Sequence, residues 1–128
     1  MTVPKTPCPV GGLVPWMNGR WPIASRKEHP VFGWLYVIHE KRGDVGLVIW
    51  ANVSQADVVA QMEAVARFPV GALLELGPMM NRRIVQRKWN FQTGAFTYLL
   101  EGSRPGREFP MDEEELIARV KDVREKSA

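Results

Sequence analysis

Apolar residues dominate two neighbouring stretches of the chain, residues 32–41 (FGWLYVIHEK) and 45–51 (VGLVIWA). Both stretches are rich in aromatic and β-branched residues, and the turn residues Arg42-Gly43-Asp44 separate them, which predicts a β-hairpin. Apolar residues occupy both faces of these strands, a pattern typical of strands that are covered on both sides. We therefore expect this hairpin to form the centre of the core.

A helical spacing of apolar residues follows in residues 54–67. Ser54 can accept a hydrogen bond from the amide of Asp57 and so cap the N-terminus of a helix, and Pro69 marks its end. The pattern predicts one amphipathic helix. The residues of its apolar stripe are Val58, Val59, Met62, Val65 and Ala66.

Residues 112–126 carry a second helical pattern. Asp112 and Glu115 match a capping box, and the acidic first turn and basic last turn suit the helix dipole. We expect this helix to pack on the free face of the sheet. The residues of its apolar stripe are Leu116, Ile117, Val120 and Val123.

Between the two predicted helices lie a short buried strand, residues 70–76, and a second hairpin, residues 82–100. A turn with an even number of residues places Arg87 and Trp89 on the core face, whereas a three-residue turn shifts the apolar set by one position. Because such a slip would send apolar side chains to water, we expect the even turn. A short helix over residues 79–89 also fits the apolar spacing, so the choice between strand and helix stays open at this point.

Residues 1–30 contain six of the ten prolines and show no helical spacing. Asn18-Gly19 is a preferred pair for a two-residue type I′ turn, which would set Trp16 opposite Trp21 across a small hairpin. The prolines that flank this hairpin do not suit the middle of a sheet, because proline lacks an amide donor. We therefore expect an N-terminal arm that covers one edge of the core.

Taken together, the elements predict an α+β fold with the order ββαβββα. We expect a mostly antiparallel sheet of about five strands with two amphipathic helices packed on it. Residues 31–128 would form a single α+β domain, and residues 1–30 would be its Pro-rich N-terminal arm with a small hairpin. No internal repeat is evident in the sequence.

Composition adds limits to this fold. A chain of 128 residues with 45% hydrophobic and 24% charged residues has an ordinary globular composition. It contains no apolar run of the roughly 20 residues that would span a membrane, and prolines interrupt its N-terminus where a signal peptide would need an apolar run. We expect a cytoplasmic protein without a membrane partner. The single cysteine, Cys8, excludes a disulfide within the chain.

Motifs for catalysis and cofactor binding are missing from the sequence. It has neither a Gly-rich phosphate loop nor a nucleophile elbow, and its only histidines are His29 and His39. One enzymatic alternative remains, a small nuclease in which His39 acts as acid or base and Arg87 or Lys88 stabilises phosphoryl charge. We predict instead a non-enzymatic protein that needs neither metal nor cofactor.

Charge points to one class of ligand. Residues 79–109 hold six Lys or Arg against two Asp or Glu, and aromatic residues stand among them. Aromatic rings can stack on bases while cations hold phosphates, so nucleic acid, DNA or RNA, is the first candidate partner. If the hairpin has an even turn, however, its rings and most of its cations divide between two faces, which weakens the hypothesis. The candidate binding residues are Arg82, Arg83, Arg87, Lys88, Trp89 and Phe91, with Lys41 and Arg42 as an extension.

The alternative is a protein-interaction module, such as an inhibitor, an immunity-type protein or an assembly accessory. Protein interfaces favour Trp, Tyr, Met and Arg, and this chain has five Trp and six Met. Trp16 and Trp21 could then form an exposed platform for a partner, and a homo-oligomer would use the same kind of surface.

Overall fold

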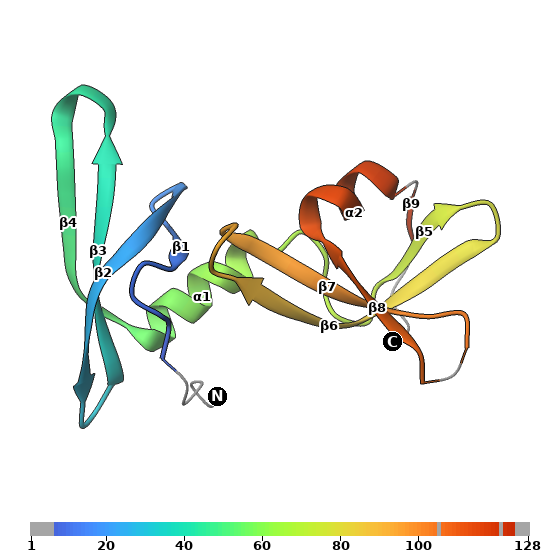
Figure 1. Cartoon of the computed structure of the whole chain (residues 1–128), viewed down its shortest axis with the longest axis horizontal. Helices are drawn as coiled ribbons and strands as arrows, with labels where there is room; N and C mark the ends of the chain where they lie inside the picture. The colour runs from blue at the N-terminus through green and yellow to red at the C-terminus, as the bar shows by residue number, and fades with distance from the viewer. Residues whose placement is uncertain (1–6, 105, 121, 125–128) are drawn as a thin grey trace. The chain divides into compact units, whose positions relative to one another are not determined.

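The computed structural model describes residues 7–104, 106–120 and 122–124. Their contacts divide the chain into two compact units. The first unit comprises Met1–Val65 and Phe91–Gly94, and the second comprises Ala66–Asn90 and Ala95–Ala128. Each unit contains one antiparallel sheet and one helix (Figure 1).

The first unit is a four-stranded meander followed by a helix. Strands β1 (Leu13–Trp16), β2 (Gly19–His29), β3 (Gly33–Arg42) and β4 (Gly46–Ser54) pair in sequence order, with a 3₁₀ turn, Gly43–Val45, between β3 and β4. Helix α1 spans Gln55–Val65 and contacts β1, β3 and β4. The buried core includes Val14, Ile23, Tyr36, Ile38 and Val58.

The second unit has the same succession of elements. Strands β5 (Leu73–Gly77), β6 (Met80–Asn90), β7 (Ala95–Glu101) and β8 (Glu108–Asp112) are followed by helix α2 (Glu113–Arg119). A short strand β9 (Asp122–Arg124) adds to β5, so the order across the sheet is β8-β7-β6-β5-β9. The buried core includes Leu74, Ile84, Tyr98, Leu100 and Leu116.

These elements confirm a mixed, antiparallel α+β fold with two helices in the described part of the chain. The predicted single sheet of about five strands is wrong, because there are two sheets. The residues assigned to an N-terminal arm form β1 and β2, and β2 is bonded on both sides. Pro22 pairs with Leu13 on β1, and pairing of β2 with β3 begins only at Ile23, so no residue of β3 needs an amide donor at position 22.

The turn of the first hairpin lies one residue earlier than the sequence indicates. Met17 and Asn18 have φ values of 46° and 66°, so they form the turn in place of Asn18-Gly19. The predicted pairing of Trp16 with Trp21 is therefore wrong: Trp16 faces Gly19, and Trp21 faces Val14. In this register Gly19 lies against the indole of Trp21, where an added Cβ would come within 2.4 Å of the ring.

One of the two predicted helix caps is present. The Ser54 hydroxyl accepts a hydrogen bond from the Asp57 amide at 3.2 Å, as expected. Asp112 makes no such cap, because its carboxylate accepts a hydrogen bond from the Thr97 hydroxyl at 3.1 Å. The predicted helix over residues 112–126 is shorter in the structure: it ends at Arg119, where Val120 is extended, and β9 follows it. Residues 121 and 125–126 of that prediction lie outside the described part of the chain.

The hairpin of residues 82–100 is a pair of strands, not a helix, and its turn has the expected even length. Arg87 pairs with Tyr98 and Trp89 with Phe96. A bulge at Val85 changes the face of the residues before it, so Ile84, which an unbroken strand would direct to the outer face, is only 1% exposed.

The two units are internal repeats of one structure, and the absence of a repeat inferred from the sequence is wrong. The strand that pairs with Tyr36 is bulged between Ile23 and Ser25, and the strand that pairs with Tyr98 is bulged between Ile84 and Gln86. The same backbone hydrogen bonds precede the bulges: Gly11 donates to Ile23 and Gly71 donates to Ile84, both at 2.8 Å.

Side chains repeat as well as backbone. Arg26 donates to the Cys8 carbonyl at 2.9 Å and lies 5.3 Å from the centroid of the Trp34 ring. Its equivalent, Arg87, donates to the Phe68 carbonyl at 3.0 Å and lies 5.1 Å from the centroid of the Phe96 ring.

A buried tyrosine stands at the same place in each repeat. We call the repeated hydrogen-bonded residues, Arg26 and Tyr36 in the first unit and Arg87 and Tyr98 in the second, the frame. Tyr36 accepts a hydrogen bond from the Cys8 amide at 2.8 Å and donates to Gln55, the first residue of α1. Tyr98 accepts from the Phe68 amide at 3.4 Å and donates at 2.7 Å to Glu113, the first residue of α2. In both repeats the hydroxyl thus ties the third strand to the start of the helix and to the segment before the first strand.

Candidate functional site

The residues predicted to bind a ligand through the β6–β7 hairpin serve mainly to hold the second unit together. Trp89 is 7% exposed and packs edge-on against Phe96, with ring centroids 5.0 Å apart. Arg87 binds Phe96 and the Phe68 carbonyl, as described above. Arg83 donates to the Gly71 carbonyl at 2.7 Å. None of these three offers its charge or ring primarily to solvent, so the hairpin is a poor stacking surface.

The other candidates of the hairpin separate from one another. Lys88 is exposed on β6. Phe91 is half-buried in the β6–β7 turn, which belongs to the first unit: its carbonyl accepts a hydrogen bond from the Leu13 amide at 2.8 Å, and its ring lies against Gly12. Arg82 is half-buried and donates to the neighbouring Asn81 carbonyl at 2.9 Å.

Arg42 is engaged in a small network on β3 and β4. Its Nε donates to Glu40 at 2.9 Å, and the indole N–H of Trp50 donates to the other oxygen of the same carboxylate at 2.6 Å. These two hydrogen bonds hold the pKa of Glu40 below its usual range. Arg42 therefore neutralises a carboxylate that is 3% exposed, and it is a weak candidate for a phosphate contact.

The buried hydroxyls of the frame and the Cys8 thiol are not reactive groups. Burial raises the pKa of Tyr36 and of Tyr98, so both stay protonated and able to donate. Burial also raises the pKa of the Cys8 thiol, which lies 3.9 Å from Gln55. These groups are positioned for structure rather than for chemistry.

Lys41 and Trp21 do come together, in a groove on the first unit of about 520 Å³. We call it the Trp21 groove. His39 and Lys41 stand two residues apart on β3 and face away from the buried Ile38 and Glu40. Its lining residues are Arg20, Trp21, Pro22, His39, Lys41 and Leu47. The lining contains basic and aromatic side chains and no carboxylate.

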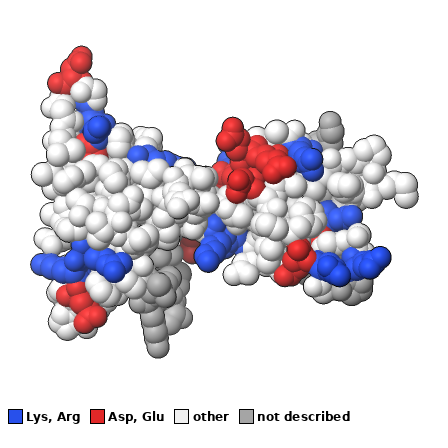
Figure 2. All heavy atoms as spheres, viewed as in Figure 1, with Lys and Arg blue, Asp and Glu red and all other residues white. Residues whose placement is uncertain are grey.

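A second basic groove, of about 470 Å³, lies on the second unit along β6 and the connection from β7 to β8. We call it the arginine groove. Three arginines line it, Arg82, Arg104 and Arg107, with Glu108 as the one acidic residue. On the face that Figure 2 draws, basic and acidic side chains lie in small separate groups within each unit.

The two grooves occupy the same place in their repeats. Trp21 stands two residues before the buried Ile23, and Arg82 stands two residues before its equivalent, Ile84. From this position the Trp21 groove extends to the ends of β3 and β4, where His39, Lys41 and Leu47 line it, and the arginine groove extends to the connection between β7 and β8. The repeats therefore place a ring and a guanidinium at equivalent positions.

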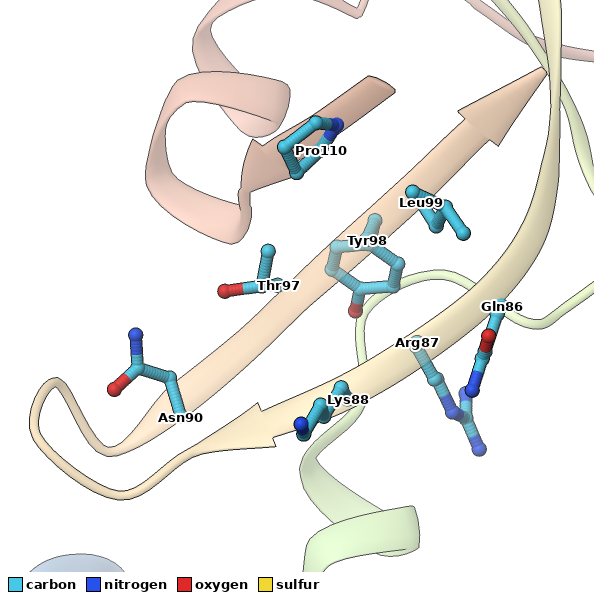
Figure 3. A pocket seen from close by; sticks show the side chains of 8 residues that line it. All are labelled: Gln86, Arg87, Lys88, Asn90, Thr97, Tyr98, Leu99 and Pro110. Carbon is cyan, nitrogen blue, oxygen red and sulfur yellow. The ribbon is translucent and has the colours of Figure 1, made fainter. Parts of the chain in front are cut away.

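A third hollow, of about 360 Å³, follows the outer side of the β6–β7 hairpin (Figure 3). Figure 3 shows Lys88 and Arg87 on β6, Thr97 and Leu99 on β7, and Pro110 on β8 around it. Its equivalent in the first unit is smaller, about 130 Å³. Two predicted residues, Arg87 and Lys88, line this hollow, and neither lines the arginine groove.

The sequence-based candidates omitted four basic residues of the grooves as ligand contacts: His39, Arg104, Arg107 and Arg20, whose Nε donates to the Gly94 carbonyl at 2.6 Å. A signal for the arginine groove was present, because Arg104 and Arg107 flank the Gly and Pro residues of one connection, but the sequence does not reveal that this connection folds back on Arg82. His39, considered only as a nuclease residue, lies in the Trp21 groove, whereas Arg87 belongs to the other unit and is bound within it.

Comparisons with known proteins add no relative: no family model, curated protein or solved structure matches the chain. Over residues 7–104, 106–120 and 122–124, no three His, Cys, Asp or Glu side chains gather as a metal site would require. The helices described are too short to cross a bilayer.

Proposed function

We propose that the protein is a non-enzymatic binding protein whose ligand is nucleic acid. The observation that carries the proposal is the recurrence of a basic groove at one place in both repeats. Chance clusters of exposed cations are common on a protein with a net charge of +3, but a repeated location indicates a surface that the fold presents twice. A phosphate of a nucleic-acid strand is a ligand that each of these basic grooves could hold by itself.

The composition of the grooves suits a ligand that carries phosphate groups. The arginine groove presents guanidinium groups, which match phosphate oxygens in planar, bidentate geometry. The Trp21 groove adds a ring beside Lys41, the combination that nucleic-acid-binding surfaces use for base and phosphate. The proposed contacts thus move from the hairpin core to the grooves, and Arg82 and Lys41 are the original candidates that stay among them.

A salt-titrated binding assay tests this proposal. We expect labelled DNA or RNA to bind at low salt and the affinity to fall steeply as salt rises, because phosphate contacts release counterions. Arg107→Glu in the arginine groove should weaken binding and lower the slope of log K against log salt by about one unit. The matched control is Arg119→Glu, which makes the same charge change on an exposed site of α2 in the same unit. No binding at low salt would refute the proposal.

The second candidate is a protein-interaction module, and β4 favours it. This strand lies at the edge of its sheet, its sequence GLVIWANVS contains neither a charge nor a proline, and Leu47 and Ile49 on its outer face are 53% and 58% exposed. Such an edge can pair with a strand of another chain. Because the strand is uncharged and apolar, a second copy of this chain is the partner that it fits, and its test is described in the Discussion.

A further inference from the structure

The indole of Trp21 is fixed in place. Its ring N–H donates to the Trp16 carbonyl at 2.8 Å, across the β1–β2 turn. Gly19 lies against the ring so closely that an added Cβ would approach Trp21 Cζ2 to 2.4 Å. The hydrogen bond and the close approach of Gly19 hold the indole on the hairpin, which lowers the side-chain ordering that a ligand must impose on binding.

The side chains around the Trp21 ring suit a ligand that combines a flat group, which can lie on the ring, with a negative charge near Lys41. Lys41 is exposed, and His39 stands beside it on the same face of β3. The nearest acidic residue in sequence, Glu40, points to the opposite face and is paired with Arg42. At the equivalent position of the second repeat, the arginine groove has Arg82 instead of Trp21, so it has a cation there and no ring.

We propose that the Trp21 groove binds an unpaired base by stacking on Trp21 while Lys41 contacts a flanking phosphate, so that the ligand is single-stranded nucleic acid. This inference rests on the proposed function and narrows its ligand. Bases of a duplex are stacked on one another and cannot lie on a side chain without being extruded, whereas each base of a single strand has an accessible face. The arginine groove contributes phosphate contacts that a duplex could satisfy equally well.

The test compares one labelled oligonucleotide, single-stranded and annealed to its complement, on the full chain and three variants. We expect Trp21→Leu to lose about tenfold or more of its single-strand affinity and to change duplex affinity little. Trp21→Phe keeps a ring and should retain most of that affinity, while the quenching of tryptophan fluorescence by the bound strand decreases. Lys41→Gln should lower the single-strand salt slope by about 0.7.

The outcomes separate this inference from the proposed function. If neither form of the oligonucleotide binds at low salt, both fail, and a protein partner becomes the better hypothesis. If both forms bind equally and Trp21→Leu changes neither, nucleic-acid binding stands and the stacking site is refuted. Circular dichroism shows whether Trp21→Leu folds. If it does not, the single-strand salt slope of Lys41→Gln and the fluorescence quenching of Trp21→Phe decide the question. Values equal to those of the unaltered chain in both measurements would refute the inference.

Discussion

Arg26 and Arg87 show how the fold can remove a cation from ligand binding. Each places its guanidinium near an aromatic ring and on a backbone carbonyl of its own unit. An Arg in a sequence carries the same charge whether it binds phosphate or a carbonyl, so composition alone does not tell the two roles apart. The cations that line the grooves are residues of the same types as Arg26 and Arg87, and only their positions in the fold differ.

Glu40 gives a pH dependence at the same scale. Hydrogen bonds from Arg42 and Trp50 lower its pKa from the usual 4.5, so the folded state favours the carboxylate. The resulting stabilisation is fully present above about pH 4.5 and is lost as the pH falls through the lowered pKa. We expect the unfolding free energy of Glu40→Gln to fall less steeply with acidification than that of the unaltered chain, measured by urea denaturation at several pH values. Equal slopes would show that the network adds no pH-dependent stability.

At the scale of elements, the sequence predicted most strands and both helices but not how the strands divide into sheets. Alternating apolar residues located the two long hairpins, and the even turn followed from keeping apolar side chains buried. The bulge at Val85 and the turn at Met17-Asn18 were missed, because each depends on contacts between residues that local spacing does not encode. Asp112 failed as a cap for the same reason, since Thr97 on a neighbouring strand binds it.

The edge strand β4 yields the prediction at this scale. We expect the chain to associate with itself at high concentration through β4, and Ile49→Lys to keep it monomeric, because a charge on an apolar edge opposes strand pairing. Light scattering coupled to size-exclusion chromatography measures the mass. Val31→Lys is the control, since Val31 is 78% exposed but lies in the β2–β3 turn. A monomer at all concentrations would contradict the prediction.

At the scale of the whole molecule, the repeat is the feature that the sequence concealed most. One short match was visible, Pro9-Val10-Gly11-Gly12-Leu13 against Pro69-Val70-Gly71-Ala72-Leu73. The remaining identities, such as the arginines and tyrosines of the frame, are scattered because insertions change the spacing between them. Only the shared hydrogen bonds show that these residues correspond. The candidate grooves were hidden for the same reason, because each joins segments that are distant in sequence.

Equivalent tyrosines should have equivalent energetic roles. We expect Tyr36→Phe and Tyr98→Phe each to lower the unfolding free energy by about 1–2 kcal/mol, because each removes a hydroxyl that serves a backbone amide and a helix side chain. Urea denaturation measures both losses. If Tyr36→Phe lowers the unfolding free energy and Tyr98→Phe leaves it unchanged, the two tyrosines have equivalent hydrogen bonds but unequal contributions to stability.

Because both repeats lie on one chain, the two grooves are always made in equal numbers. Two separate single-module proteins would depend on matched expression to supply a ring-bearing and a guanidinium-bearing groove in equal amounts. Here one translation event makes one of each. The stoichiometry is fixed by the covalent chain, and a substitution can alter one groove while the other keeps its residues.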